Sequence, residues 1–341
     1  MSTRDREIEI VRLAHGSGGE TMGKLIRERI LPRFDNPLLR TLSDSAVFDV
    51  APASRLAFTT DSYVVDPIFF PGGDIGYLAV CGTVNDLAVC GARPLYLSVG
   101  LIVEEGLPMT DLEKILDSMA RAAAEAGVQL ITGDTKVVAR GAADRIFINT
   151  AGVGLLNEGV ALGPERCKAG DAVIVSGPIG SHGIAVLAAR EDFGLETELK
   201  SDVAPLAGQV QALLEACPEV HMMRDPTRGG LAGVLVEIAA ASGLGIELHE
   251  GKIPVTDAVR GACEILGFDP LFIANEGVFA AVIPGHSSET AVKALKRAGA
   301  GKASLIGRVT EDDPGIVSVE TVVGGKRILV PLGDELLPRI C

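Results

Sequence analysis

A polar joint, NEGVALGPERCKAGD at residues 157–171, divides the chain into two parts. Apolar runs typical of strands alternate with amphipathic runs typical of helices on both sides of this joint. A chain of 341 residues is also too long for one ordinary hydrophobic core. We therefore predict an α+β fold with two mixed α/β domains, residues 1–157 and 158–330, followed by a flexible, mobile tail of residues 331–341.

Local signals place the elements within these domains. Asp74 and Gly91 are expected to begin and end one helix, and a capping box of Thr110 and Glu113 predicts a second helix that Gly127 closes. In the first half, strands are expected at 7–13, 55–65, 94–103, 128–138 and 145–156. In the second half, helices are expected at 181–191, 204–216, 227–242, 255–266 and 287–299, and strands at 171–177, 244–249, 271–274, 278–283, 304–309 and 326–330.

The charge of the chain limits its partners. A formal net charge of −14 argues against a nucleic-acid partner, because phosphate backbones attract basic surfaces. A nucleotide is still compatible, since it needs only a local site and can be bound through a metal ion. The start of the chain lacks the apolar core of a signal peptide, and no apolar run approaches the ~18 residues of a membrane span. Six cysteines without a C-x-x-C pair fit reduced thiols, so we expect a cytoplasmic protein.

The glycine-rich segment HGSGGETMGKL, residues 15–25, partly matches a phosphate-binding loop. Gly18 and Gly23-Lys24 have the spacing of a P-loop, but Leu25 stands where the magnesium-binding hydroxyl is required, so an ordinary P-loop is not expected. Backbone N–H groups of this loop can still form a nest for anionic oxygen. A flexible loop without a binding role explains the same sequence equally well.

Four aspartates of the first domain stand at element ends or inside apolar runs. A carboxylate in such a setting is costly to bury unless it is paired or bound to a metal. Together they predict a Mg²⁺ site, because this ion takes carboxylate, water and phosphate oxygens. Taken singly, each is better explained as a cap or turn residue. The four are Asp44, Asp61, Asp86 and Asp134, with Asn85 as a neighbour that supports them.

Two motifs of the second domain are candidates for chemistry. Asp225, Thr227, Gly229 and Gly230 open a predicted helix, where the glycines allow an anion to approach the N-terminal N–H groups. A well-capped core helix explains the same residues. Glu276 lies in a turn after an apolar run and is a candidate base, although a turn-forming role is the simpler explanation. The histidines 15, 182 and 221 show no metal-ligand spacing.

The chain closes with ELLPRIC, and Cys341 is its last residue. This cysteine is not part of a C-a-a-X lipidation box, which needs the cysteine four residues from the end. It is therefore either incidental or carried by a moving arm. Eleven residues at ~3.3 Å each give the arm a reach of up to ~35 Å, enough to move between an internal site and an outside partner.

These segments together resemble the hydrogenase maturation factor family HypE, within the superfamily of aminoimidazole ribonucleotide synthetase and selenophosphate synthetase. The resemblance covers essentially the whole chain. The motifs that carry it are HGSGGE, TTDSYVVDPIFFPGGDIG, GTVNDLAVCGARP, TGDTKVV, DPTRGGL and ANEG, together with the terminal PRIC that is specific to the HypE branch.

The resemblance implies an aminoimidazole ribonucleotide synthetase-like fold and an ATP-dependent carbamoyl dehydratase. The terminal cysteine would receive a carbamoyl group from HypF, and ATP would drive dehydration of the thiocarboxamide to a thiocyanate. The cyanide would pass to iron held by HypC and HypD. A homodimer through the N-terminal sheets is also implied. A selenophosphate synthetase-like enzyme, another synthetase of the superfamily, or a non-catalytic thiol carrier remain alternatives.

The resemblance also implies roles for individual residues. Cys341, Lys136 and Glu276 are the expected catalytic residues. The four aspartates are the expected Mg–ATP ligands. The residues expected to bind the cofactor are His15, Gly16, Ser17, Gly18, Gly19, Asp44, Asp61, Asn85, Asp225, Thr227, Gly229 and Gly230.

Overall fold

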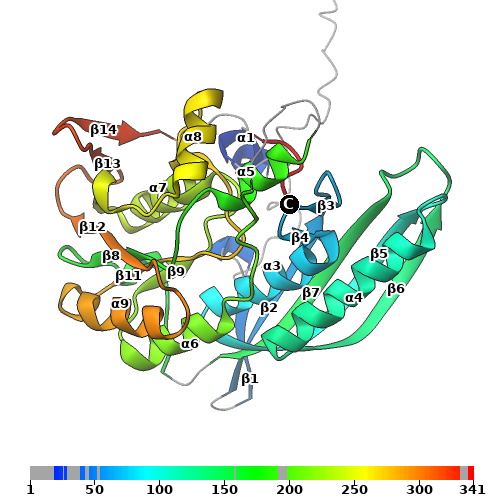
Figure 1. Cartoon of the computed structure of the whole chain (residues 1–341). Coiled ribbons are helices and arrows are strands. Elements are labelled where there is room, and N and C mark those ends of the chain that lie inside the picture. The colour runs from blue at the N-terminus through cyan, green and yellow to red at the C-terminus, as the bar shows by residue number, and fades with distance from the viewer. Residues whose placement is uncertain are drawn as a thin grey trace, which may run out of the picture.

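The computed structural model describes residues 19–25, 27–28, 39–42, 46–51, 54–156, 159–190, 198–330 and 337–341. Two sheets, each with its own helices, lie side by side (Figure 1). The predicted α+β class with mixed elements in both halves is confirmed. Short elements near the start of the chain are α1 (Gly19–Leu25) and a 3₁₀ turn at Leu39–Thr41. The expected strand at 7–13 lies outside the described residues.

The first sheet has the strand order β1-β2-β7-β5-β6. Only β5 and β6 run parallel, and the other neighbours are antiparallel. Two helices, α3 and α4, cover one face of this sheet (Figure 1). The elements are β1 (Ala46–Ala51), β2 (Ser54–Tyr63), β3 (Phe69–Phe70), β4 (Gly73–Asp74), α3 (Ile75–Val89), β5 (Ala92–Glu104), α4 (Met109–Ala126), β6 (Gln129–Val138) and β7 (Ile146–Leu156).

Helix α3 lies between the first sheet and the second domain. Asp74 caps it as predicted, because its carboxylate accepts hydrogen bonds from the N–H groups of Gly76 and Tyr77 at 2.8 and 3.1 Å. The helix packs against the first sheet and α4 on one side and against α6 of the second domain on the other. Asp86 is the single residue of α3 that is not buried, and the structure describes this helix in full.

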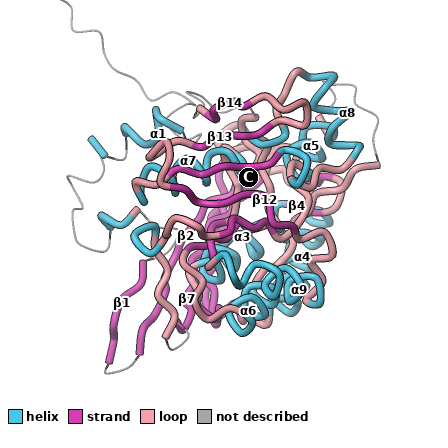
Figure 2. Tube along the Cα trace, turned by 90° about the vertical axis from the view of Figure 1, so that its left-hand side faces the viewer, coloured by secondary structure: helices cyan, strands magenta, loops and turns pink. Residues whose placement is uncertain are grey.

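The second sheet has the order β14-β13-β10-β12-β8-β11-β9, in which only β10 and β13 run parallel. Side chains of β8 alternate between two cores: Val173 and Val175 pack with α7, whereas Ala172 and Ile174 pack with α6 and α9. Helices α6 and α9 lie side by side in both views (Figures 1 and 2). Strand β8 is therefore buried on both faces.

The bounds of the second domain agree with most of the predicted elements. The helices are α5 (Ser181–Ala188), α6 (Ala207–Ala216), α7 (Gly230–Ser242), α8 (Asp257–Leu266) and α9 (Ser288–Arg297). The strands are β8 (Ala172–Val175), β9 (Met222–Arg224), β10 (Gly245–His249), β11 (Ala280–Ile283), β12 (Ser304–Thr310), β13 (Val317–Glu320) and β14 (Lys326–Leu329).

Three local predictions are wrong. The expected strand at 271–274 is a 3₁₀ turn at Pro270–Phe272, which the Asp269 side chain caps. The Thr110–Glu113 capping box does not form, because α4 begins one residue earlier, after Pro108, without a side-chain cap. Helix α7 begins at Gly230 rather than 227, since Gly229 has a left-handed φ of 79°. No helix among the described residues is long and apolar enough to cross a membrane.

Candidate functional site

Five acidic residues, which we call the carboxylate cluster, lie where the two domains meet: Asp61, Asp86, Asp202, Asp225 and Glu276. Tyr63, at the end of β2, is the shared neighbour of three of them. Burial raises the pKa of its phenol, and the negative charges of Asp61, Asp86 and Glu276 raise it further. The cluster thus joins β2 and α3 of the first domain to loops of the second.

Asp61 and Asp86 belong to the first domain. The hydroxyl of Thr59, two residues before Asp61 on the same face of β2, donates to the Asp86 carboxylate at 2.9 Å. Burial raises the pKa of Asp61, and the positive charge of Arg228 opposes that rise. Both carboxylates therefore lie on the side of β2 that faces α3.

Glu276 is 3% exposed, and its backbone is held from two directions. Asn85 donates to its carbonyl oxygen at 3.1 Å, while one Asp202 oxygen accepts from the N–H groups of Glu276 and Gly277 at 3.2 and 2.9 Å. A Cβ on Gly277 would lie 1.8 Å from the Asp202 carbonyl oxygen, so only glycine fits there. The turn that carries Glu276 is therefore fixed by both domains.

The electrostatics of Glu276 differ from those of an ordinary carboxylate. Burial raises its pKa well above the usual value, and the charges of Asp225, Asp61 and Asp202 add to that effect. Its Oε1 atom has no hydrogen-bond partner among the described residues. A carboxylate in this state is a stronger base than one in water, which suits it to accept a proton.

The amide of Asn85 is fully used by the chain. Besides Glu276, it donates to the Ala204 carbonyl at 3.1 Å and accepts from the Leu206 N–H at 2.8 Å. Asn85 thus links α3 to the loop before α6 and to the Glu276 turn. Support of the four aspartates by Asn85, and its direct contact with a cofactor, stay predictions.

The DPTRGG motif lies at the start of α7, beside the cluster. Asp225 is buried, and its carbonyl accepts from the Thr227 N–H at 3.0 Å. Gly229 and Gly230 have left-handed φ values of 79° and 62°, and a Cβ on Gly230 would lie 2.5 Å from the Leu271 carbonyl. The glycines therefore serve this close packing, and binding of an anion by this turn stays a prediction.

Asp134 and Lys136 are not brought to the cluster within one chain. Cross-strand pairing places Asp134 beside Gly100, and Gly100 beside Asn149, on the face opposite to Asp61 and its neighbours. Lys136 and Asp134 form an ion pair at 2.8 Å, with side chains 71% and 70% exposed. A single site with all four aspartates would therefore need more than one copy of this chain.

The remaining predicted phosphate-side residues are placed only in part. Gly19 opens α1, whereas His15, Gly16, Ser17, Gly18 and Asp44 lie outside the described residues. The described part of the chain holds no group of three His, Cys, Asp or Glu side chains arranged for a metal ion. Mg²⁺ needs only one or two carboxylates when phosphate and water complete its shell. Asp61 and Asp86 meet that requirement, and the Glu276 oxygen that has no partner among the described residues lies at the same junction.

The C-terminal segment, residues 337–341, is docked between the domains (Figure 1). The Val64 N–H, one residue after Tyr63, donates to the Cys341 carbonyl at 3.1 Å. Leu337 and Ile340 are buried, and Cys341 packs against the core that contains Tyr63 and Ala274. The end of the tail therefore reaches the neighbourhood of the Glu276 turn.

Four of the other cysteines, Cys81, Cys167, Cys217 and Cys263, are buried. Burial raises the pKa of the Cys81 and Cys217 thiols, and raises those of Cys167 and Cys263 to about 12 and about 11. Thiols with such pKa values hold little thiolate at neutral pH.

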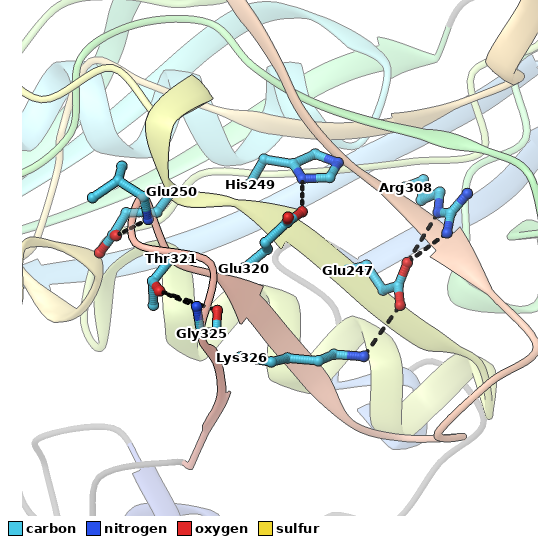
Figure 3. Close-up of polar contacts among 9 residues, drawn as sticks. Glu247, His249, Glu250, Arg308, Glu320, Thr321, Gly325 and Lys326 are labelled. Carbon is cyan, nitrogen blue, oxygen red and sulfur yellow. Dashed lines mark hydrogen bonds and ion pairs between the residues drawn. The ribbon is translucent and has the colours of Figure 1, made fainter.

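A second polar cluster lies on the exposed surface of the second sheet (Figure 3). Glu247 accepts from Nε and Nη2 of Arg308 at 3.0 and 2.8 Å, and from Lys326 at 3.2 Å. His249 pairs with Glu320 at 2.8 Å on the neighbouring strand. We call these residues the Glu247 cluster; its charges are paired with one another and offer no reactive group.

Two residues of the site were missed from the sequence. Asp202 lies in the irregular segment before α6, where no periodicity signals a role. Arg228 is inside the DPTRGG motif, but only the structure shows that its charge faces Asp61 and Glu276. A cation directly before the two glycines that open the helix was the available signal.

Known proteins match this chain along its whole length. Profiles of the AIR synthase related protein N-terminal and C-terminal domains match residues 42–156 and 168–320. The protein "Carbamoyl dehydratase HypE" of Azotobacter vinelandii is 47% identical over 342 residues, which is 100% of both chains.

Two solved structures share both fold and sequence with this chain. The HypE chain of a HypE–HypF complex has a TM-score of 0.85 and 47% identity, covering 90% of this chain and 99% of that one. HypE in complex with ATP has a TM-score of 0.81 and 47% identity, covering 96% and 99%. The chain therefore belongs to the HypE family of AIR synthase related proteins.

Proposed function

We propose that this protein is an ATP-dependent carbamoyl dehydratase of [NiFe]-hydrogenase maturation, and that Cys341 carries the substrate. A carbamoyl group on its sulfur, a thiocarboxamide, would be converted to a thiocyanate and supply the cyanide ligands of iron. The observation that carries the proposal is the docked tail, whose last residue packs beside the domain junction that holds Glu276.

The reaction balances as the loss of one water driven by one ATP. Transfer of the γ-phosphoryl group to the carbamoyl oxygen turns a poor leaving group into phosphate, and one N–H proton is lost as the C=N bond forms. Loss of the second N–H proton then breaks the C–O bond and leaves S–C≡N. Glu276, with its raised pKa and its unpartnered oxygen among the described residues, is the proposed acceptor of a proton.

Asp61 and Asp86 are the proposed holders of Mg²⁺. The ion, when bound with ATP, would offset the charge that develops on the transferring phosphoryl group. The residues of this chain would bind it, orient the tail and keep the reacting carbon away from water. Asp44 and the loop of residues 15–19 are the further candidates for this nucleotide site, as the sequence suggested.

Association is proposed to use the open face of the first sheet. Large apolar side chains stand exposed on the face that α3 and α4 leave uncovered, among them Phe58, Tyr96 and Ile102. An exposed apolar face of this kind favours a protein partner. A second copy packed on it would bring Asp134 and Lys136, which share this face, into the interface. HypF as the carbamoyl donor and HypC–HypD as the cyanide acceptor are the other proposed partners.

The proposal is tested by loading the tail. The protein is incubated with HypF, carbamoyl phosphate and Mg–ATP, and its intact mass is followed. We expect one carbamoyl group on wild-type protein, then a product lighter by one water, and neither species on Cys341→Ala. Cys263→Ala is the matched control, because Cys263 is a buried core thiol, and it should behave as wild type. An adduct mapped to any other cysteine would contradict the role of Cys341.

A further inference from the structure

Hydrogen bonds to its backbone hold the docked tail against the body of the protein. The Pro338 and Arg339 carbonyls accept from Nη2 of Arg190 at 2.7 and 2.9 Å. The Ile340 carbonyl bonds Nε2 of His182 at 2.8 Å, and the Cys341 carbonyl accepts from the Val64 N–H. Each of the last four carbonyls therefore has a hydrogen-bond donor supplied by the body of the protein.

The orientation of His182 is fixed by its two ring contacts. The ring is fully buried, and burial lowers its pKa to about 4, so it is neutral. Because a carbonyl can only accept, Nε2 must carry the hydrogen, and Nδ1 must accept from the Ser201 hydroxyl at 2.8 Å. The edge contact of the Phe70 ring, 5.4 Å between centroids, holds the imidazole plane. Contacts that do not involve the tail thus fix the direction of the Nε2–H donor.

The first turn of α5 connects this donor to the Glu276 turn. The N–H groups of Gly180 and Gly183 donate to the Asn275 side chain at 2.6 Å and to the Ala274 carbonyl at 3.1 Å. The Asp202 carboxylate, which accepts from the N–H of Glu276, lies close to the backbone of His182. His182 therefore lies between the backbone next to Cys341 and the carboxylate that positions Glu276.

Arg190 makes the matching connection on the other side of the tail. Its Nε donates to the Asp66 carbonyl at 2.8 Å, and the Asp66 N–H donates to the Arg339 carbonyl at 3.2 Å. Arg339 in turn donates from Nε to the Val64 carbonyl at 2.9 Å. The tail is therefore clamped between the segment after β2 and the end of α5.

We propose that His182 and Arg190 are positioning residues that seat the tail so that Cys341 is presented to the Glu276 turn. This rests on the proposed function for its chemical consequence, but the seating itself is independent of it. Seating favours dehydration and opposes loading, because a partner enzyme must reach the same sulfur. Loss of either residue should therefore change the two half-reactions in opposite directions.

The seating of the tail can be measured without an activity assay, as the rate at which iodoacetamide alkylates Cys341. Intact mass spectrometry follows the reaction, with Cys341→Ala giving the background from the other thiols. We expect Arg190→Ala and His182→Ala to be alkylated about tenfold faster than wild type, the effect of losing one buried hydrogen bond. His182→Gln, whose amide N–H can replace Nε2–H, should restore part of the protection.

His221→Gln is the matched control. His221 is also a buried histidine, but it bonds Asp171 at 2.7 Å, away from the tail, so its loss should leave alkylation unchanged. Should His182→Ala fail to fold, Arg190→Ala still tests the clamp, since Arg190 is only half-buried. Wild-type alkylation rates in folded Arg190→Ala and His182→Gln would overturn the proposal.

The second measurement uses tail-carbamoylated protein with Mg–ATP in a single turnover. The seating variants should dehydrate about tenfold more slowly, while HypF loads them at least as fast as wild type and the KM for ATP is unchanged. Faster alkylation with normal dehydration would show that the seat does not serve the reaction. If carbamoylated wild type is never dehydrated, while unmodified wild type is still protected from alkylation at Cys341, the proposed function fails and the seating of the tail stands.

Discussion

Two glutamates of the second domain lie in opposite environments, and we propose that only the buried one takes part in the reaction. Glu247 stands on the solvent-facing side of β10, where hydrogen bonds from Arg308 and Lys326 lower its pKa (Figure 3). Glu276 is buried at the domain junction, where burial and three other carboxylates raise its pKa. The same side chain is thus stabilised as an anion in one place and as an acid in the other. Glu276, whose Oε1 atom has no hydrogen-bond partner among the described residues, is the one that we propose for the chemistry.

The largest effect should come from replacing Glu276. Glu276→Gln keeps the size of the side chain and its buried position but removes the proton acceptor. We expect single-turnover dehydration to fall by about 10²–10⁴-fold, with thermal stability unchanged or raised. Mass spectrometry of tail-carbamoylated protein measures the rate. Glu247→Gln is the matched control, and a normal rate in Glu276→Gln would place the base elsewhere.

Replacing Asp86 should have the next largest effect on dehydration, because it weakens the proposed metal site without removing the proposed base. Asp86→Asn keeps an acceptor for the Thr59 hydroxyl but removes one negative charge. We expect dehydration to require a much higher Mg²⁺ concentration, whereas the folded state is kept. A Mg²⁺ titration of phosphate release gives the answer. The same Mg²⁺ dependence in the variant and in wild type would remove Asp86 from the proposed ligands.

The pH dependence should separate the two glutamates as well. Glu276 must lose its proton to act as a base, so its raised pKa predicts that dehydration rises with pH well above the ordinary range of a carboxylate. For stability the sign is opposite. The folded state binds this proton more tightly than the unfolded state. The stability that the protonated Glu276 contributes is therefore present below pH 4.5, the ordinary pKa of a glutamate, and is lost as pH rises toward the pKa in the folded state.

Glu276→Gln should therefore gain stability relative to wild type as pH rises above 4.5. Urea unfolding at several pH values measures this difference. If the free energy of unfolding changed with pH equally in the variant and in wild type, the Glu276 pKa would not be raised in the folded state.

The smallest effect should come from the Glu247 cluster. Exposed ion pairs are screened by water and salt and contribute little to stability. Arg308→Ala should leave dehydration and loading unchanged and should shift the melting temperature only slightly, and less at high salt. A large loss of activity in Arg308→Ala would show that this surface takes part in the reaction.

Local patterns predicted the parts of the molecule that depend on neighbours in sequence. Asp74 caps α3 because its side chain reaches N–H groups two and three residues ahead, and Gly127 ends α4 with a left-handed φ of 69°. The 271–274 segment is apolar like a strand, but Asp269 and Pro270 form a 3₁₀ turn instead. Periodicity cannot distinguish these two outcomes over so few residues.

The site was predictable only where a motif carried it. Glu276 and the DPTRGG turn stand in motifs, whereas Asp202 lies in an irregular segment and is brought to Glu276 by tertiary contacts across 74 positions. His182 was considered only as a metal ligand, and its bond to the Ile340 carbonyl spans 158 positions. Contacts of this separation depend on how the domains pack, which no local pattern records.

The central claim is that this chain, with its own docked tail, removes water from the carbamoyl group on Cys341. Its most direct test is a single turnover of purified, tail-carbamoylated protein with Mg–ATP and no other protein present. Intact mass and released phosphate are measured in the same sample. The account predicts the loss of one water for each phosphate released, on Cys341 alone. Phosphate release without loss of water, or a reaction that needs a second protein, would contradict it.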